Sequence, residues 1–454
     1  MERNLTVGSV PKNLLYFALP YLLSYFLQTL YGMADLFIVG QFAPVAATTA
    51  VSIGSQVMHM LSVVLVGLAM GTTVQVAQAV GGGNRAEASR TIGNTVTLFA
   101  GVTVALTVLL VALVRPIVAV MSTPAEAVEG TVAYLTVCFL GIPFITAYNI
   151  LSAIFRGMGD SKSPLYFIAM ACGVNIGLDY LFIGALDMGP VGAALGTTLS
   201  QAVSVGIALL FIWRRKIGPW VGRSDLRPVR PVMGRLLSIG LPIALQDGLI
   251  QVAFMVITVI ANRRGLTDSA AVGIVEKIIG FLFLVPSSML STVSALGAQN
   301  IGAGKPERAE ATLRYALLIT GGFGAVMAVL FQWAATGAVA LFTPDTAVAI
   351  AGGTYLRGYI LDCAFAGIHF SFSGYFCARG KSGLSFLHNL LAIVLVRIPG
   401  AYIASLQFPD TLLPMGLATA AGSLFSAIVC LIAFAVIRRQ DRQAAAKANG
   451  GQDG

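Results

Sequence analysis

Two short stretches of the sequence, QAVGGGN at residues 78–84 and QNIGAGK at residues 299–305, share the pattern Gln-x-x-Gly-x-Gly. Tyr134-Leu135 recurs as Tyr355-Leu356 at the same offset that separates the two motifs. A sequence that resembles itself at a nearly fixed offset over most of its length is built from repeats of one structural unit. The chain is therefore predicted to consist of two related halves.

The composition predicts that these halves lie in a membrane. Hydrophobic residues make up 57% of the 454 residues and charged residues 10%, whereas a soluble domain carries about 25% charged residues. A helix needs about 20 apolar residues to cross a bilayer, and the apolar runs lack the polar alternation of barrel strands. The fold class predicted is an all-α membrane protein with twelve transmembrane helices in two pseudo-symmetric six-helix lobes. The apolar segments fall at about 14–38, 46–78, 91–114, 127–153, 163–186, 190–213, 235–261, 270–298, 313–337, 347–376, 384–406 and 413–437.

The longest polar stretch divides the twelve segments into six and six. The predicted organisation is an N-lobe at 1–213 (helices 1–6), a cytoplasmic inter-lobe loop at 214–234, a C-lobe at 235–438 (helices 7–12) and a disordered cytoplasmic tail at 439–454. An even number of helices per repeat gives both halves the same orientation. We therefore expect parallel repeats about an axis along the membrane normal, with a cavity between them.

The distribution of positive charge predicts the orientation. Of the Lys and Arg residues in the predicted loops and tails and at the ends of the spans, 22 lie on the side of the N-terminus and three lie on the opposite side. Because basic loops remain in the cytoplasm, we expect a multi-pass protein of the cell inner (plasma) membrane with both termini cytoplasmic. The net charge of +9 then needs no nucleic-acid partner, and binding of anionic lipid is a secondary use for it.

Together these features resemble the multidrug and toxic compound extrusion (MATE) family over about residues 10–438. The resemblance includes Leu-Pro early in the first and seventh spans, the paired Gln-x-x-Gly-x-Gly motifs, and the related turns after the fourth and tenth spans. The Leu-Pro pairs are Leu19-Pro20 and Leu241-Pro242, and the turns are FRGMGDSKS at 155–163 and FCARGKSGL at 376–384.

Within the family, Asp35 together with Asn175-x-x-x-Asp179 resembles the DinF-like branch. The resemblance implies an antiporter that exports amphipathic, often cationic, drugs or metabolites by alternating access. It also implies that inward flow of H⁺ or Na⁺ drives the export, and that no other cofactor is needed.

Ionisable groups inside a spanning helix are costly and are functional candidates by default. At 1.5 Å per residue, Asp35 lies about 7 Å, Asp179 about 10 Å, Thr197 about 12 Å and Asn175 about 16 Å from the outer ends of their predicted helices. Asn175 and Asp179 are four residues apart and therefore face the same way. Three helices of the first half thus bring four polar groups to one layer.

Two carboxylates with amide and hydroxyl oxygens can coordinate a hard cation or hold one shared proton. By resemblance, Asp35, Asn175, Asp179 and Thr197 match the cation or proton site of the N-lobe, with no metal expected beyond Na⁺ at that site. Gln28 and Tyr31 lie on the same stripe of the first helix as Asp35 and are predicted to face bound substrate. A hydrogen-bond network that only holds helices together remains the alternative for both sets.

The second half offers a weaker pattern. Asp247 and Gln251 are an i, i+4 pair and form a possible polar site of the C-lobe. By resemblance, some sodium-coupled relatives carry an acid near the position of Gln251, which puts an ion site here in doubt. The other charged residues in or near these spans are expected to pair with one another; they are Glu276, Lys277, Arg357, Asp362 and Arg397.

Two other functions fit the sequence less well than an exporter. A flippase for lipid-linked precursors would hold pyrophosphate with cationic residues, whereas the polar layer of the first half is acidic. An enzyme is not expected, because the sequence contains neither His-Glu-x-x-His nor Gly-x-Ser-x-Gly. The expected partners are a small-molecule substrate and the lipid bilayer, and a monomer is expected.

Overall fold

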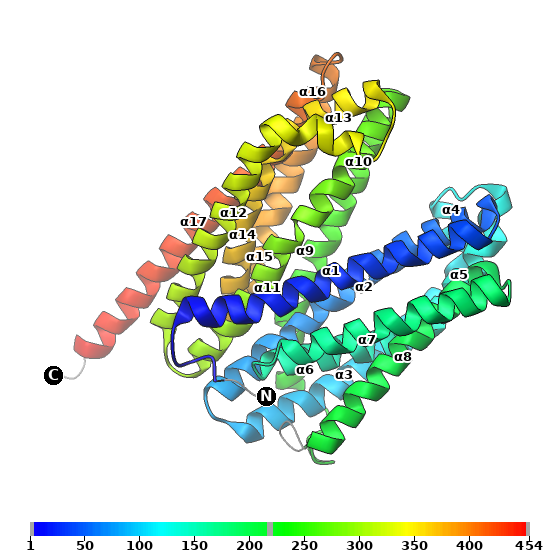
Figure 1. Ribbon diagram of the computed structural model, residues 1–454. Helices are drawn as coiled ribbons and strands as arrows, with labels where there is room; N and C mark the ends of the chain where they lie inside the picture. Colours follow the sequence, from blue (N-terminus) through cyan, green and yellow to red (C-terminus); the bar gives the residue numbers. More distant parts are fainter. Residues whose placement is uncertain (1–3, 216–220, 451–454) are drawn as a thin grey trace. The chain divides into compact units, whose positions relative to one another are not determined.

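The computed structural model describes residues 4–215 and 221–450, and every regular element in them is a helix (Figure 1). The elements before residue 216 are α1 (Val10–Phe42), α2 (Val45–Gly81), α3 (Arg85–Ala112), α4 (Val114–Val120), η1 (Ala125–Ala127), α5 (Val128–Leu140), α6 (Ile142–Gly157), α7 (Lys162–Asp179), η2 (Tyr180–Ala185) and α8 (Gly189–Arg215). Those after residue 220 are α9 (Arg230–Asn262), α10 (Leu266–Leu282), α11 (Leu284–Gly302), α12 (Pro306–Ala340), α13 (Thr346–Tyr359), α14 (Leu361–Ala378), α15 (Ser382–Ala392), η3 (Ile393–Arg397), α16 (Ile398–Gln407) and α17 (Leu413–Gly450).

These elements provide twelve candidate membrane spans. Eleven helical stretches in the described residues are long and apolar enough to cross a bilayer, and the bent pair α5–α6 adds a twelfth. Six spans precede residue 216 and six follow residue 220. A helix satisfies its own backbone polar groups, which is what the hydrocarbon core requires. The predicted fold class is confirmed.

The fourth span differs from the uninterrupted helix that the sequence predicts at 127–153. It consists of two helices, α5 and α6, which meet at Gly141 and are bent by 48°. Pro143, at the start of α6, has no backbone N–H to continue the hydrogen bonding of α5. A Cβ on Gly141 would lie 2.6 Å from the Thr198 side chain, so only glycine allows α8 to pack at this bend. By contrast, α1 continues as a helix through Pro20.

Two compact units can be distinguished by their internal packing. The first comprises Met1–Gly248, Ser291–Thr312 and Ala378–Gly380, and the second comprises Leu249–Leu290, Leu313–Cys377 and Lys381–Gly454. The lobe boundaries at 213 and 235 stay a prediction. The disordered tail at 439–454 also stays a prediction; in the described residues α17 runs to Gly450. The run Ala444-Ala445-Ala446 has high helix propensity and favours this continuation.

The two Gln-x-x-Gly motifs lie against each other within the first unit. A Cβ on Gly81 would lie 2.0 Å from the carbonyl oxygen of Gln299, and a Cβ on Gly302 would lie 2.0 Å from the carbonyl oxygen of Gln78. The ends of α2 and α11 therefore cross with their backbones in contact, and each glycine makes room for the other helix. This reciprocal contact explains why both halves carry glycine at the same position.

The glutamines of the two motifs make equivalent hydrogen bonds. Gln78 Nε2 donates to the carbonyl oxygen of Ala378 at 2.9 Å, and Gln299 Nε2 donates to that of Gly157 at 3.0 Å. Ala378 and Gly157 are the last residues of α14 and α6, whose final carbonyls have no partner inside the helix. Each motif thus stabilises one helix crossing and caps one helix.

Candidate functional site

The predicted cation site is assembled where α1, α7 and α8 pack together. The helix α7 contacts both α1 and α8. Asp35 comes from α1, Asn175 and Asp179 from the last two turns of α7, and Thr197 from the third turn of α8. All four side chains are buried, Asn175 and Asp179 completely. The structure therefore brings together the four residues that the sequence placed in one layer.

The polar groups contact one another directly. Thr197 Oγ1 donates to Asp35 Oδ2 at 3.1 Å, and Asn175 Nδ2 donates to Asp179 Oδ1 at 3.5 Å, a long and weak bond. The carboxyl groups of Asp35 and Asp179 are near enough to influence each other's charge. Two neighbouring carboxylates repel strongly when both are ionised in a site of low dielectric. A proton or a metal cation between them would remove that repulsion.

Three buried oxygen atoms of the site have no hydrogen-bond donor among the described residues. They are Asp35 Oδ1, Asn175 Oδ1 and Asp179 Oδ2. Most buried polar atoms are satisfied, so an unsatisfied group calls for an explanation. Carboxylate and amide oxygens are the ligands of hard cations such as Na⁺, and a carboxylate oxygen is also where a proton would bind. The donor set fits either ion.

Gly196 is a fifth member of the site that the sequence analysis missed. A Cβ at this position on α8 would lie 2.1 Å from Asp179 Oδ1 and 3.5 Å from Asn175 Nδ2. The absence of a side chain therefore gives the Asp179 carboxyl its place against the α8 backbone. A glycine adjacent to Thr197, on the helix facing the acids, is the only signal of this contact in the sequence.

The two predicted substrate residues are less well defined by their contacts. Tyr31 is half-buried and lies close to Asp35. Gln28 is also half-buried, one turn of α1 earlier, and makes no side-chain hydrogen bond with another described residue. Both lie on the stripe of α1 that ends at Asp35. Their predicted contact with substrate stays a prediction.

The possible polar site of the C-lobe is represented by two half-buried side chains of α9, Asp247 and Gln251. The Asp247 carboxyl accepts a long hydrogen bond of 3.5 Å from Gln246 Nε2. No group of three His, Cys, Asp or Glu side chains suited to a metal ion occurs in the described part of the chain. The pair remains a prediction.

The second unit contains a buried ion pair between Arg397 and Asp362. Both belong to the charged residues that the sequence analysis expected to pair with one another. Arg397 Nη2 donates to Asp362 Oδ2 at 3.1 Å and to the Tyr359 hydroxyl at 2.9 Å. The guanidinium also lies 5.3 Å from the centre of the Phe254 ring. Arg397 is 6% exposed and Asp362 0%, so each charge depends on the other in the membrane interior.

Glu276, another member of that charged set, takes a different partner. Its Oε2 accepts a hydrogen bond of 3.0 Å from Thr258 Oγ1 of the neighbouring helix α9. Arg397 is near enough to attract it electrostatically. Arg397, Asp362 and Glu276 thus have partners within the second unit, which favours a structural role for these three residues.

Twelve spans in two repeated halves, with a buried polar site in one of them, are the architecture of a secondary transporter. The chain belongs to the MATE family: the family model described as MatE matches residues 20–181 and 242–403. The two matched segments cover corresponding parts of the two halves, which agrees with the internal repeat. Assignment to the DinF-like branch stays a prediction.

The names of curated relatives of similar length refer to multidrug resistance or multidrug export. The chain is 26% identical over 394 residues to the probable multidrug resistance protein YpnP of Bacillus subtilis, covering 87% of this chain and 88% of the relative. It is 24% identical over 392 residues to the multidrug export protein MepA of Staphylococcus aureus strain MRSA252, covering 85% and 86%.

Solved structures confirm the fold. A crystal structure of MATE in the bent conformation has a TM-score of 0.90 at 22% identity, covering 97% of this chain and 98% of that one. A MOP superfamily transporter from Pyrococcus furiosus has a TM-score of 0.87 at 22% identity, covering 94% and 96%. At this identity the likeness concerns the fold alone.

Proposed function

We propose that this protein is an antiporter that exports amphipathic, often cationic, small molecules across the inner (plasma) membrane in exchange for H⁺ or Na⁺. Membership of the MATE family and the drug-export names of its relatives support the export of small molecules. The observation that carries ion coupling is the buried pair Asp35–Asp179, with oxygen atoms that lack donors. Keeping two carboxylates inside the membrane is costly, and ion binding gives a reason for them.

Coupling would follow from the electrostatics of this pair. The vacant, ionised pair is unfavourable at low dielectric, so an ion that enters from outside stabilises a state in which Asp35 and Asp179 are close together. Asp35 lies on α1 beside Tyr31, so repositioning of α1 would change the surface offered to substrate. A ligand shifts such an equilibrium only by its different affinity for the two states.

Competition between ion and substrate is the consequence. Because linkage is reciprocal, the ion should weaken substrate binding by the same factor as substrate weakens ion binding. Substrate affinity of the purified protein, measured across pH and across Na⁺ concentration, tests this scheme. Affinity that is unaffected by both ions would place the acids at another step of the cycle.

The decisive test of the function is transport in proteoliposomes with pH and Na⁺ gradients imposed separately. We expect one gradient to drive drug export, and Asp35→Asn and Asp179→Asn each to abolish that coupling while the protein remains folded by size-exclusion chromatography. Asp187→Asn is the matched control, because Asp187 is exposed and lies outside the site. Export that needs neither gradient would refute the proposal, and wild-type transport by either site variant would remove that residue from the mechanism.

The orientation belongs to the same proposal. The charge split of 22 to three supports cytoplasmic termini, and export then runs from the side of the termini to the outside. We propose a monomer that needs no cofactor beyond the coupling ion.

A further inference from the structure

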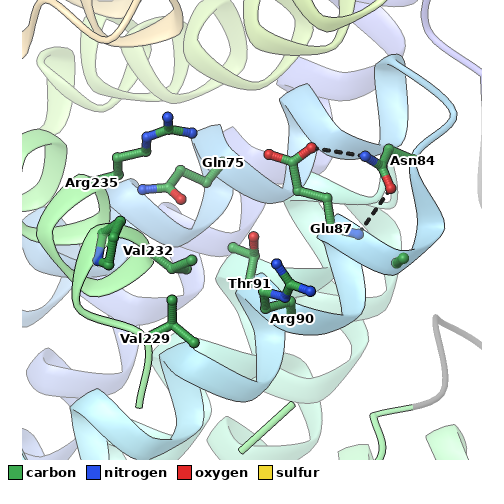
Figure 2. A pocket seen from close by; sticks show the side chains of 10 residues that line it. Gln75, Asn84, Glu87, Arg90, Thr91, Val229, Val232 and Arg235 are labelled. Atoms are coloured by element: carbon green, nitrogen blue, oxygen red, sulfur yellow. Dashed lines mark hydrogen bonds between the residues drawn. The ribbon is translucent and has the colours of Figure 1, made fainter. Parts of the chain in front are cut away.

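The first unit contains a pocket lined by charged, polar and apolar side chains, separate from the proposed cation site (Figure 2). Its volume is about 410 Å³, and its walls are the end of α2, the start of α3, and Val229 with the first turns of α9. Figure 2 shows Gln75, Glu87, Arg90, Thr91 and Arg235 around the same space. The pocket lies where α2 ends and α3 begins, on the side predicted to be cytoplasmic.

One wall of the pocket is fixed by hydrogen bonds to α3. The Val229 backbone N–H donates to Asn94 Oδ1 at 2.7 Å, while Asn94 Nδ2 donates to the Asp225 carbonyl at 3.2 Å. Thr97 Oγ1 donates to the Leu226 carbonyl at 2.7 Å. Residues 225–229 are thus held along α3, so the pocket is preformed on this side and a ligand need not order that wall.

Several side-chain hydrogen-bond donors in the lining of the pocket have no acceptor in the described part of the chain. The guanidinium groups of Arg90 and Arg235 make no ion pair or hydrogen bond with another described residue. Gln75 Nε2 is buried and lacks an acceptor within the same described ranges. The one carboxylate, Glu87, accepts a hydrogen bond from Asn84 Nδ2 at 3.1 Å.

We infer that this pocket binds a phosphate-bearing anion through Arg90, Arg235 and Gln75. Guanidinium groups pair with phosphate through two parallel hydrogen bonds, and an amide N–H₂ adds a further donor. Thr91, buried at the same wall, supplies a hydroxyl. The anion comes either from the headgroup of an anionic phospholipid, which is plentiful at a cytoplasmic membrane surface, or from a soluble phosphate compound.

The test compares two double variants with the same change of net charge. Arg90→Gln/Arg235→Gln removes the guanidinium groups of the pocket, whereas Arg85→Gln/Arg230→Gln removes exposed arginines from the same two helices that do not line it. Native mass spectrometry would measure binding of dioleoylphosphatidylglycerol, with dioleoylphosphatidylcholine as the uncharged comparison. Thermal unfolding would be measured with inorganic phosphate and pyrophosphate.

We expect the pocket variant to bind the anion at least about tenfold more weakly, since a hydrogen bond to a charged group contributes roughly 1.5–3 kcal/mol. The control variant should bind like the wild type. Preference for phosphatidylglycerol assigns the site to lipid, and stabilisation by phosphate or pyrophosphate assigns it to a soluble anion. An equal loss of anion binding in both variants would mean that the overall charge attracts the anion, and this would overturn the inference. Failure of the wild type to bind any of these probes would overturn it as well. Neither readout depends on transport.

Discussion

Substitution of Gly196 by alanine tests the site without removing any of its charges. The added Cβ would lie 2.1 Å from Asp179 Oδ1, whereas a carbon and an oxygen in contact are normally about 3.3 Å apart. The carboxyl group or the α8 backbone must therefore move by about 1 Å. Asp179 is packed between α7 and α8 and completely buried, so the displacement takes it from its present position beside Asp35 and Asn175.

The size of the effect follows from the cost of overpacking. Extra methyl groups in a packed interior cost about 1–3 kcal/mol, which corresponds to about 5- to 150-fold in the affinity for the coupling ion if the strain falls on the ion-bound state. Export in proteoliposomes should then need a correspondingly higher concentration of H⁺ or Na⁺. The assay is the dependence of the export rate on the concentration of the driving ion at fixed drug concentration.

Gly206→Ala provides the control on the same helix. No atom lies within 4 Å of a Cβ built at Gly206, so this variant should transport normally and be as stable as the wild type or slightly more stable. Unchanged ion dependence in Gly196→Ala would refute the reasoning, because it would mean that the position of the Asp179 carboxyl does not matter. Equal impairment of both variants would instead assign the effect to α8 as a whole.

Three further predictions concern other parts of the molecule. Arg397→Met leaves the Asp362 carboxylate buried without its partner and should lower the free energy of unfolding by about 3–5 kcal/mol. Adding Asp362→Asn to this variant should restore part of the lost stability. An unchanged thermal stability of Arg397→Met would show that the ion pair is not formed. Gly302→Ala should destabilise the helix crossing by about 1–3 kcal/mol, whereas Gly101→Ala, with no atom within 4 Å of the new Cβ, should not. Ser224→Cys should react with an impermeant maleimide from the cytoplasmic side only, against a low background because the five native cysteines are buried; labelling from outside would reverse the topology.

The clustering of Asp35, Asn175, Asp179 and Thr197 could be predicted from the sequence because depth and helix face can both be read from residue spacing. Counting from the helix ends placed Asp35 and Asp179 in one layer, and the i, i+4 spacing placed Asn175 beside Asp179. Spacing within one helix does not determine how a neighbouring helix is rotated about its axis. The contact of Gly196 with Asp179 depends on that rotation, and this is why it could not be predicted.

Sequence spacing also does not determine which charged groups of the second unit pair with one another. Five charged residues in or near its spans allowed several pairings, and only the packing of α14 against η3 selects Asp362 for Arg397. The bend at Gly141 is a related case, since a glycine and a nearby proline occur in many straight spans. The need for glycine at the bend comes from the Thr198 side chain, which belongs to α8 and is distant from Gly141 in the sequence.

The repeat separates the scaffold of this protein from its chemistry. The motif residues that recur in both halves, Gln78 and Gln299 among them, make equivalent contacts in the fold. The acids do not recur: when the halves are aligned on these motifs, or shifted by one position as the Leu-Pro pairs require, Asp35 corresponds to Val256 or Ile257, and Asp179 to Gly400 or Ala401. The contacts that recur therefore belong to the repeated fold, whereas the Asp35–Asp179 pair belongs to the first half alone. Two acids buried in the membrane spans of one half support the proposal that the ion site lies there.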